Sequence, residues 1–169
     1  MSDAADIASL HAASWRDVYT ALIPGGLPSG VEGNRTDFWA GHLSALQDGC
    51  IVLAAFDGTE LLGFAASEPC PDDPAAACLA ALHVDPTSRG RRVGQALMAA
   101  LANKLIAAGT ARLWCHVLET NHAARRFYAR LGAVEGAAEQ VHLMDGLYTR
   151  DLRLAFPPLD NLMMLAGKG

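Results

Sequence analysis

Residues 82–97 constrain the fold most, because three structural signals follow one another there without a break. An apolar run that ends before Pro86 predicts a buried strand, a short loop rich in arginine and glycine follows, and an amphipathic helix begins at Val93. Unpaired backbone N–H groups and the positive end of the helix dipole meet where such a loop enters a helix. The segment therefore predicts an anion site, and the small residues Gly94 and Ala96 would let a phosphate approach the backbone.

Known phosphate loops do not account for this segment. It lacks the Gly-Lys-Ser/Thr ending of a Walker loop and the GxGxxG pattern of dinucleotide-binding folds. Taken alone, a basic turn before a helix is more typical of a solvated helix end than of a ligand site. The rest of the chain must decide between the two interpretations.

The other hydrophobic patterns predict a single α/β domain at residues 1–156, followed by a C-terminal tail at 157–169. A hairpin gives antiparallel pairing and a strand–helix–strand crossover gives parallel pairing, so we expect a mixed sheet. The expected elements are helices at 3–22 and 36–46, hairpin strands at 51–56 and 61–67, a loop at 69–74, a strand at 78–84, a helix from Val93 that ends at Gly109, a strand at 111–119, a helix from Asn121 to Gly132, and closing strands at 133–137 and 141–154, the second of which Asp145-Gly146 could split.

Composition excludes several classes of function. A formal charge of −5 argues against a non-specific nucleic-acid binder, which needs an excess of Lys and Arg. The four cysteines have no CxxC or Cys/His ligand spacing, so we expect free thiols and no metal site. The first residues do not resemble a signal peptide, and no run of 18 apolar residues predicts a membrane span. We therefore expect a cytoplasmic protein.

Two motifs resemble those of the GCN5-related N-acetyltransferases, the GNAT superfamily. Arg91, Gly94 and Ala96 match the coenzyme A motif R/Q-x-x-G-x-G/A, with Leu-His-Val-Asp-Pro before it. The second motif resembles N-x-x-A-x-x-F/L-Y and runs from Asn121 to Tyr128. The spacing between the motifs also fits, and the resemblance extends from about residue 3 to about residue 155.

The resemblance implies a fold in more detail. We expect a mixed, largely antiparallel central sheet with one parallel, splayed strand pair and with helices on both faces. The chain begins at the expected first helix, so the strand that usually opens the family's fold is missing from the sequence given. The tail at 159–165 or a second subunit would cover the sheet edge left by it, which makes a homodimer possible.

The resemblance also implies acetyl-CoA as cosubstrate, an amine as acceptor, direct attack within a ternary complex, and no metal. Strand residues before the loop would offer backbone groups to the pantetheine arm, and the loop and helix amides would hold the pyrophosphate. Tyr128 would protonate the departing thiolate, a role that suits a phenol. The implied coenzyme-binding residues are Leu82, His83, Val84, Arg89, Arg91, Arg92, Val93, Gly94, Gln95, Ala96, Asn121 and Tyr128.

The sequence leaves open which residue is the base that takes the proton of the acceptor amine. His116 occupies the strand position at which the amino-terminal acetylases of ribosomal proteins carry a glutamate, and His83 is its competitor. Glu68 and Glu119 are outside candidates, and Cys115 as an acyl carrier is a weaker mechanistic variant.

The alternatives to an enzyme are a non-catalytic module that senses acyl-CoA and a self-associating interaction domain. No pattern in the sequence identifies the acceptor substrate. A cationic acceptor would be favoured by the loop and helix carboxylates Glu32, Asp37, Asp72 and Asp73.

Overall fold

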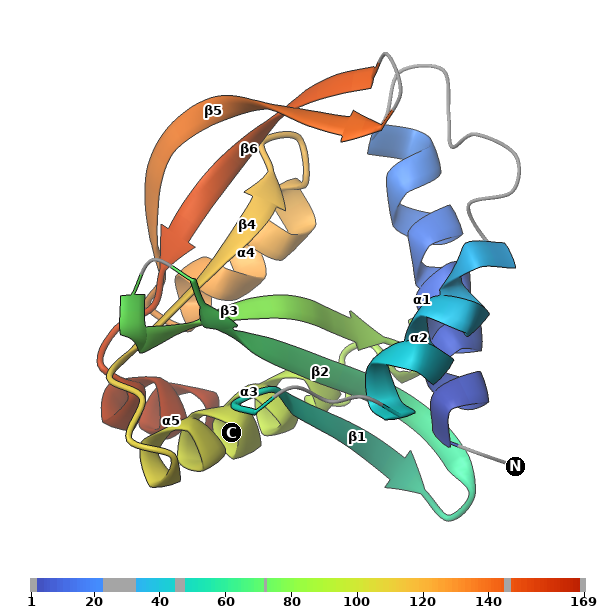
Figure 1. The fold of residues 1–169 in the computed structure, drawn as a ribbon, viewed down its shortest axis with the longest axis horizontal. Helices are drawn as coiled ribbons and strands as arrows, with labels where there is room; N and C mark the ends of the chain where they lie inside the picture. The colour runs from blue at the N-terminus through green and yellow to red at the C-terminus, as the bar shows by residue number, and fades with distance from the viewer. Residues whose placement is uncertain (1–2, 23–32, 45–47, 72, 145–146, 168–169) are drawn as a thin grey trace.

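The computed structural model describes residues 3–22, 33–44, 48–71, 73–144 and 147–167, which form one mixed α/β fold (Figure 1). The elements in chain order are α1 Asp3–Leu22, α2 Gly33–Ser44, β1 Ile51–Asp57, β2 Glu60–Cys70, β3 Asp73–Val84, the short 3₁₀ turn Pro86–Ser88, α3 Val93–Ala107, β4 Arg112–Leu118, α4 His122–Arg130, β5 Val134–Met144, β6 Leu147–Ala155 and α5 Leu159–Gly167.

The sheet has six strands in the order β1-β2-β3-β4-β6-β5. All neighbours pair antiparallel except β3 and β4, which are joined through the crossover helix α3 and pair parallel. This is the expected largely antiparallel sheet with one parallel pair, so the predicted fold class is confirmed.

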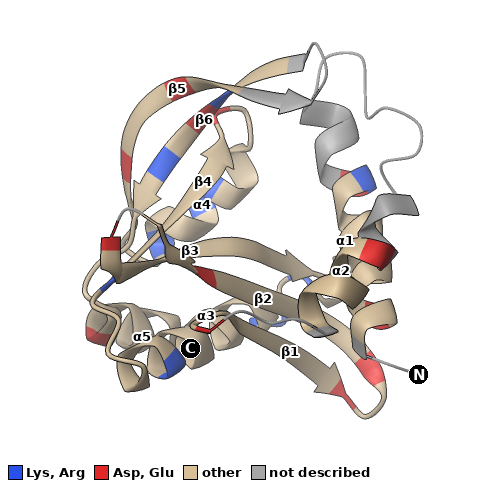
Figure 2. Cartoon of the chain, in the orientation of Figure 1, with Lys and Arg blue, Asp and Glu red and all other residues tan. Residues whose placement is uncertain are grey.

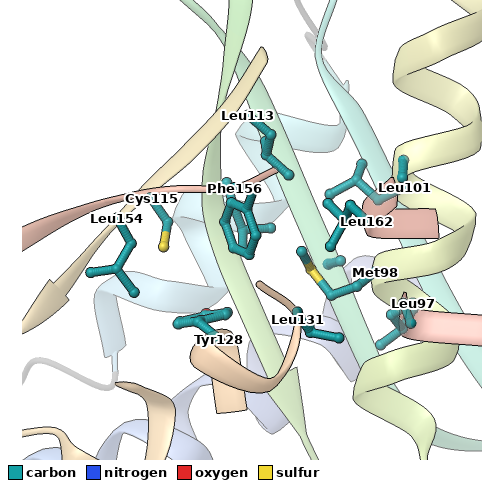
Figure 3. Packing of buried hydrophobic residues seen from close by; sticks show 14 of the residues in the cluster. Leu97, Met98, Leu101, Leu113, Cys115, Tyr128, Leu131, Leu154, Phe156 and Leu162 are labelled. Carbon is teal, nitrogen blue, oxygen red and sulfur yellow. The ribbon is translucent and has the colours of Figure 1, made fainter. Parts of the chain in front are cut away.

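Helices cover both faces of the sheet, because alternate strand residues are apolar on both sides in its central part. On one face, α3, α4 and α5 pack on the larger core (Figure 3), and its strand residues include Leu113, Cys115 and Leu154. On the other face, α1 and α2 pack over β2 and β3, where Phe64 is fully buried against Trp39. The first helix therefore lies across the sheet from the coenzyme motif helix.

The loop predicted at 69–74 is wrong, because β2 continues to Cys70 and β3 already begins at Asp73. Proline and aspartate are rare in central strands, which is why the sequence favoured a loop. Pro69 is tolerated because the pairing of β1 with β2 begins at Ser67, so this end of β2 has no second neighbour, and a register shift follows Pro69.

Other element boundaries also differ from those that the sequence predicted. The second helix begins at Gly33 rather than at residue 36, and residues 45–47 lie outside the described part. The break expected between 137 and 141 is wrong, because β5 runs from Val134 to Met144, and β6 begins at Leu147, after the Asp145-Gly146 pair that lies outside the described residues.

The segment set apart as a C-terminal tail is the helix α5. Its residues Leu159, Leu162 and Ala166 are buried in the larger core, and the helix packs against α3. The helix therefore packs against α3 on one face of the sheet, whereas the outermost strands of the sheet are β1 and β5 (Figure 1). No strand precedes α1 within the described residues.

Two absences are limited to the described residues. None of their helices is long and apolar enough to cross a membrane. None of their His, Cys, Asp and Glu side chains gather in a group of three or more that could hold a metal ion.

Candidate active site

A cavity opens where β3 and β4 stop pairing. Four register pairs join the two parallel strands, and the last is Leu79 opposite Cys115. Beyond this point β3 stays paired with β2 as far as Val84, whereas β4 stays paired with β6 as far as Leu118. Because each strand follows its antiparallel partner, the two diverge (Figure 1), and a cavity of about 710 Å³ lies at the divergence.

The N-terminus of α3 forms one end of this cavity. The side chain of Asp85 caps the preceding 3₁₀ turn by accepting from the Thr87 backbone N–H at 2.9 Å. Arg92 then adopts a left-handed conformation with φ 64°, and no side chain caps the first turn of α3. Since the first intrahelical donor is Ala96, the amides before it, including those of Val93 and Gly94, are left for a ligand.

The arginines of the loop divide between two roles. Arg89 and Arg92 line the cavity, although Arg89 also pairs with Asp17 of α1 at 2.7 Å. Arg91 turns to the carboxylate of Asp57 at 3.1 Å and is not among the residues that line the cavity. The positive potential at the end of α3 therefore comes from Arg89, Arg92 and the helix dipole.

Close packing between helices explains the glycine at position 94 of the coenzyme motif. A Cβ atom on Gly94 would lie 3.3 Å from Cζ of Phe127 on α4 and 3.5 Å from Cγ2 of Val84. The missing side chain lets α4 approach α3, which closes one wall of the cavity. Ala96, the other small residue of the motif, is exposed and does not line the cavity.

Asn121 begins α4 at the cavity wall. Its Oδ1 accepts from the backbone N–H of Ala124 at 3.1 Å, so the side chain is the N-cap of the helix. Asn121 also lines the cavity. Capping and exposure to the cavity therefore coincide in one residue.

Tyr128 lies at the boundary between the cavity and the larger core. It is 8% exposed, and its ring makes edge contacts with Phe127 and Phe156. Figure 3 shows the ring beside Leu131, with Cys115 and Leu154 above it. The residue also lines the cavity, so its ring packs while the side chain stays within reach of a ligand.

The two candidate histidines have different surroundings. His116 is the first residue of β4 after its pairing with β3 ends, is exposed, and lines the cavity. His83 also lines the cavity, but its Nδ1 lies 2.8 Å from Oγ of Ser14, and its ring lies 4.5 Å from that of His11. His83 is thus held between the sheet and α1, whereas His116 projects from β4 beyond the end of its pairing with β3.

Glu68, Glu119 and Cys115, the less favoured catalytic candidates, do not line the cavity. Glu68 is opposite Cys78 on β3, and Glu119 binds Arg150 at 2.8 Å, and neither lines the cavity. Burial raises the pKa of the Cys115 thiol to about 12, and the residue does not line the cavity. A thiol that stays protonated is a poor acyl carrier.

The cavity therefore gathers most of the residues predicted for the site. Arg91 and Ala96 are the two that do not line it. Those that do are Leu82, His83, Val84, Arg89, Arg92, Val93, Gly94, Gln95, His116, Asn121 and Tyr128.

The lining residues that were not expected include Ser14, Arg130 and Asp151. Strand alternation could have indicated Asp151, because it places that residue on the face opposite the buried Leu152 and Leu154. Of the carboxylates thought to favour a cationic acceptor, Asp37 and Asp73 do not line the cavity, and Asp73 binds Arg112 at 2.7 Å. Two others, Glu32 and Asp72, lie outside the described residues.

Comparison with known proteins points to one family. A model of the acetyltransferase (GNAT) family matches residues 12–133, and no curated protein matches the chain. A ribosomal-protein-alanine N-acetyltransferase from Brucella melitensis has a similar structure, with 20% identity, a TM-score of 0.67, and coverage of 91% of this chain and 95% of that chain.

Two further solved structures are similar and carry the coenzyme. An acetyltransferase from Salmonella typhimurium, solved with acetyl-CoA, has 18% identity, a TM-score of 0.66, and coverage of 94% of this chain and 91% of that chain. An N-acetyltransferase from Thermoplasma acidophilum in complex with coenzyme A has 16% identity, a TM-score of 0.64, and coverage of 91% and 92%.

Proposed function

Because the chain belongs to the GNAT acetyltransferase family, we propose that it transfers the acetyl group of acetyl-CoA to a primary amine. The observation that carries the proposal is the cavity at the strand divergence, which has an uncapped helix N-terminus and two arginines at one end. A large anionic substrate with a long neutral arm fits such a site, since its phosphates match the basic end and its arm the gap between strands.

The coenzyme would be held mainly by the backbone. The amides before Ala96 and the guanidinium groups of Arg89 and Arg92 would bind the pyrophosphate. The end of β3, from Leu82 to Val84, would offer backbone groups to the pantetheine arm. This arrangement directs the thioester toward the point where β3 and β4 part, next to His116.

The reaction would proceed by direct attack in a ternary complex. His116 would take a proton from the acceptor nitrogen, whose lone pair would then attack the thioester carbon. A C–N bond would form and the C–S bond would break, and the thiolate would leave with the bonding electrons and receive a proton from Tyr128. The nitrogen would lose its second proton to the resulting phenolate, which leaves a neutral amide and restores the phenol. His83, held by Ser14, remains the competing base.

Charge reversal at the two ends of α3 tests the proposal. Arg92→Glu places a carboxylate at the basic end of the cavity, so it should raise the Kd for acetyl-CoA at least about tenfold. Lys104→Glu makes the same charge change about 18 Å along the helix, beyond the Debye length of about 8 Å, and should leave the Kd unchanged.

Titration calorimetry measures the two affinities, and thiol release in the presence of an amine panel measures turnover. Equal affinities in the wild type and Arg92→Glu would contradict the coenzyme site. Tight binding of acetyl-CoA without acetylation of any amine would instead support the alternative of a non-catalytic acyl-CoA sensor.

A further inference from the structure

Charged side chains are divided unequally around the cavity. Arg89 and Arg92 lie where the loop enters α3, and Arg130 lies on α4. Among the described residues that line the cavity, Asp151 of β6 has the only carboxylate. Phosphates bound at the basic end would leave this carboxylate to the second substrate.

Asp151 shares a sheet face with His116. The antiparallel register places Asp151 opposite Leu118 and Arg153 opposite His116, so Asp151 and His116 are diagonal neighbours on adjacent strands. The alternate residues of β4, such as Cys115 and Val117, point into the larger core instead. The carboxylate and the imidazole therefore flank the same stretch of the cavity, beside the point where β3 and β4 part.

The carboxylate of Asp151 is incompletely satisfied. Its Oδ1 is buried and has no hydrogen-bond partner among the described residues. Burial raises the pKa of Asp151 above its ordinary value, and the nearby His116 opposes the shift. An unpaired buried oxygen costs folding free energy, so a donor supplied by a ligand would complete the site.

Neighbouring arginines do not supply that donor. Arg150 binds Glu119 at 2.8 Å, and the guanidinium of Arg153 lies over the Trp114 ring, 4.3 Å from its centroid. On the other side, Glu139 of β5 is directly opposite Asp151. Figure 2 shows β5 with acidic segments only, and neither of its glutamates lines the cavity.

We propose that Asp151 binds the ammonium form of the acceptor amine and holds it beside His116, which makes the enzyme selective for aliphatic amines that are cationic at neutral pH. The inference rests on the proposed acetyl transfer. The ammonium donates a hydrogen bond to the carboxylate and gives one proton to the imidazole. The free lone pair then attacks the thioester, with the bond changes described above.

Two small probes separate charge recognition from catalysis. n-Butylamine is cationic at neutral pH, whereas methoxyamine is a neutral nucleophile. Asp151→Asn should lower kcat/KM for n-butylamine at least about tenfold, the usual scale for a lost charge-assisted hydrogen bond, and leave methoxyamine unaffected. Glu139→Gln removes the same charge directly across the strand pair and should leave kcat/KM for both amines unchanged.

Thermal stability supplies a second readout. Loss of a residue with a purely structural role would lower Tm, whereas the proposal predicts a higher Tm. A raised carboxyl pKa means that ionisation costs the folded state more than the unfolded state, so Asp151→Asn should raise Tm at neutral pH. The gain should vanish below the ordinary Asp value of 3.8, where the carboxyl is protonated in both states. The titratable and charged side chains that face Asp151 are those of His116, Glu139 and Arg153, and all three are unchanged in the variant.

The outcomes distinguish this inference from the function on which it rests. Equal losses for both amines, a lower Tm in Asp151→Asn, or the same loss in Glu139→Gln would overturn the role of Asp151 while acetyl transfer stands. Failure of the wild type to acetylate either amine, with acetyl-CoA bound, would overturn both the acetyl transfer and the role of Asp151.

Discussion

Tyr128 combines a packing role with the proposed role of proton donor. Its ring packs against Phe127 and Phe156 at the edge of the larger core, and the residue also lines the cavity. Such packing fixes the ring, so the hydroxyl is presented in one orientation. This fixed orientation supports the proposed role of Tyr128 as proton donor, because the side chain would lose no conformational freedom when the thiolate departs.

Tyr128→Phe should therefore separate the two purposes. The substitution keeps the ring, so acetyl-CoA affinity should stay near the wild-type value, while turnover should fall about 10²-fold, the usual scale for a lost general acid. Single-turnover thiol release and calorimetry measure the two quantities. Tyr148→Phe, at a side chain 60% exposed on β6, removes the same group outside the cavity and is the control. Wild-type turnover in Tyr128→Phe would limit the residue to packing.

The two candidate histidines, His83 and His116, differ in their packing contacts. His83 lies against His11 and Ser14, so its side chain contributes to the contact between the sheet and α1. His116 is exposed and contacts the Trp114 ring in an edge arrangement. A residue with few packing partners can be replaced with little loss of stability.

His116→Gln should lower kcat about 10²-fold and leave both Tm and acetyl-CoA affinity unchanged. His83→Gln should instead lower Tm, because it disturbs the contacts with Ser14 and His11, and should lower kcat much less. Differential scanning fluorimetry and steady-state kinetics give the comparison. The reverse pattern would assign the base to His83.

At the scale of elements, the strongest sequence signals were helical. Leu97, Leu101 and Leu105 repeat every four residues and are all buried on α3, as the stripe predicted. The helix at 3–22 and the start of a helix at Asn121 were also predicted correctly. These signals are local, since a helix shows its buried face within two turns.

The strand ends were harder to predict, since their residues depend on neighbours distant in the chain. Pro69 is acceptable in β2 only because β1 no longer pairs there. Asp151 enters the cavity only because β6 is the neighbour of β4, and the sequence does not give that strand order by itself. At the α3 end of the cavity most lining residues were therefore predicted from the sequence, although the predicted Arg91 and Ala96 do not line it, whereas near β6 His116 was predicted and Asp151 was not.

The N-terminus of α3 shows a local conformation that the sequence did not reveal. Arg92 is the non-glycine residue with positive φ among the described residues, a conformation that costs an L-residue about 1–2 kcal/mol. The left-handed turn starts the helix abruptly, directly after the loop. The charged side chain and the first amides of α3 consequently lie at the same end of the cavity.

At the scale of the whole molecule, α5 contributes to the stability of the domain. Leu162 is fully buried, and Leu165 lies 3.1 Å from the position of a Cβ atom on Gly132, at the end of α4. The helix thereby ties α3 and α4 together beneath the sheet. We infer that the folding unit includes residues 159–167 as well as the part that carries the cavity.

Leu162→Ala should lower the free energy of unfolding by about 3 kcal/mol, within the range of about 2–5 kcal/mol for buried leucines. Urea denaturation measures the change. Met164→Ala on the same helix, where the side chain is 54% exposed, should have little effect. A stability of Leu162→Ala equal to the wild type would show that α5 is dispensable for folding.

The divergence of β3 and β4 also gives the sheet an edge in its interior. Outer edges invite strands from other chains, whereas this one can admit only a narrow, extended guest. Every residue except proline presents the same N–H and C=O groups along such an edge. The side chains of β3 can therefore be exchanged while the backbone groups of the interior edge persist.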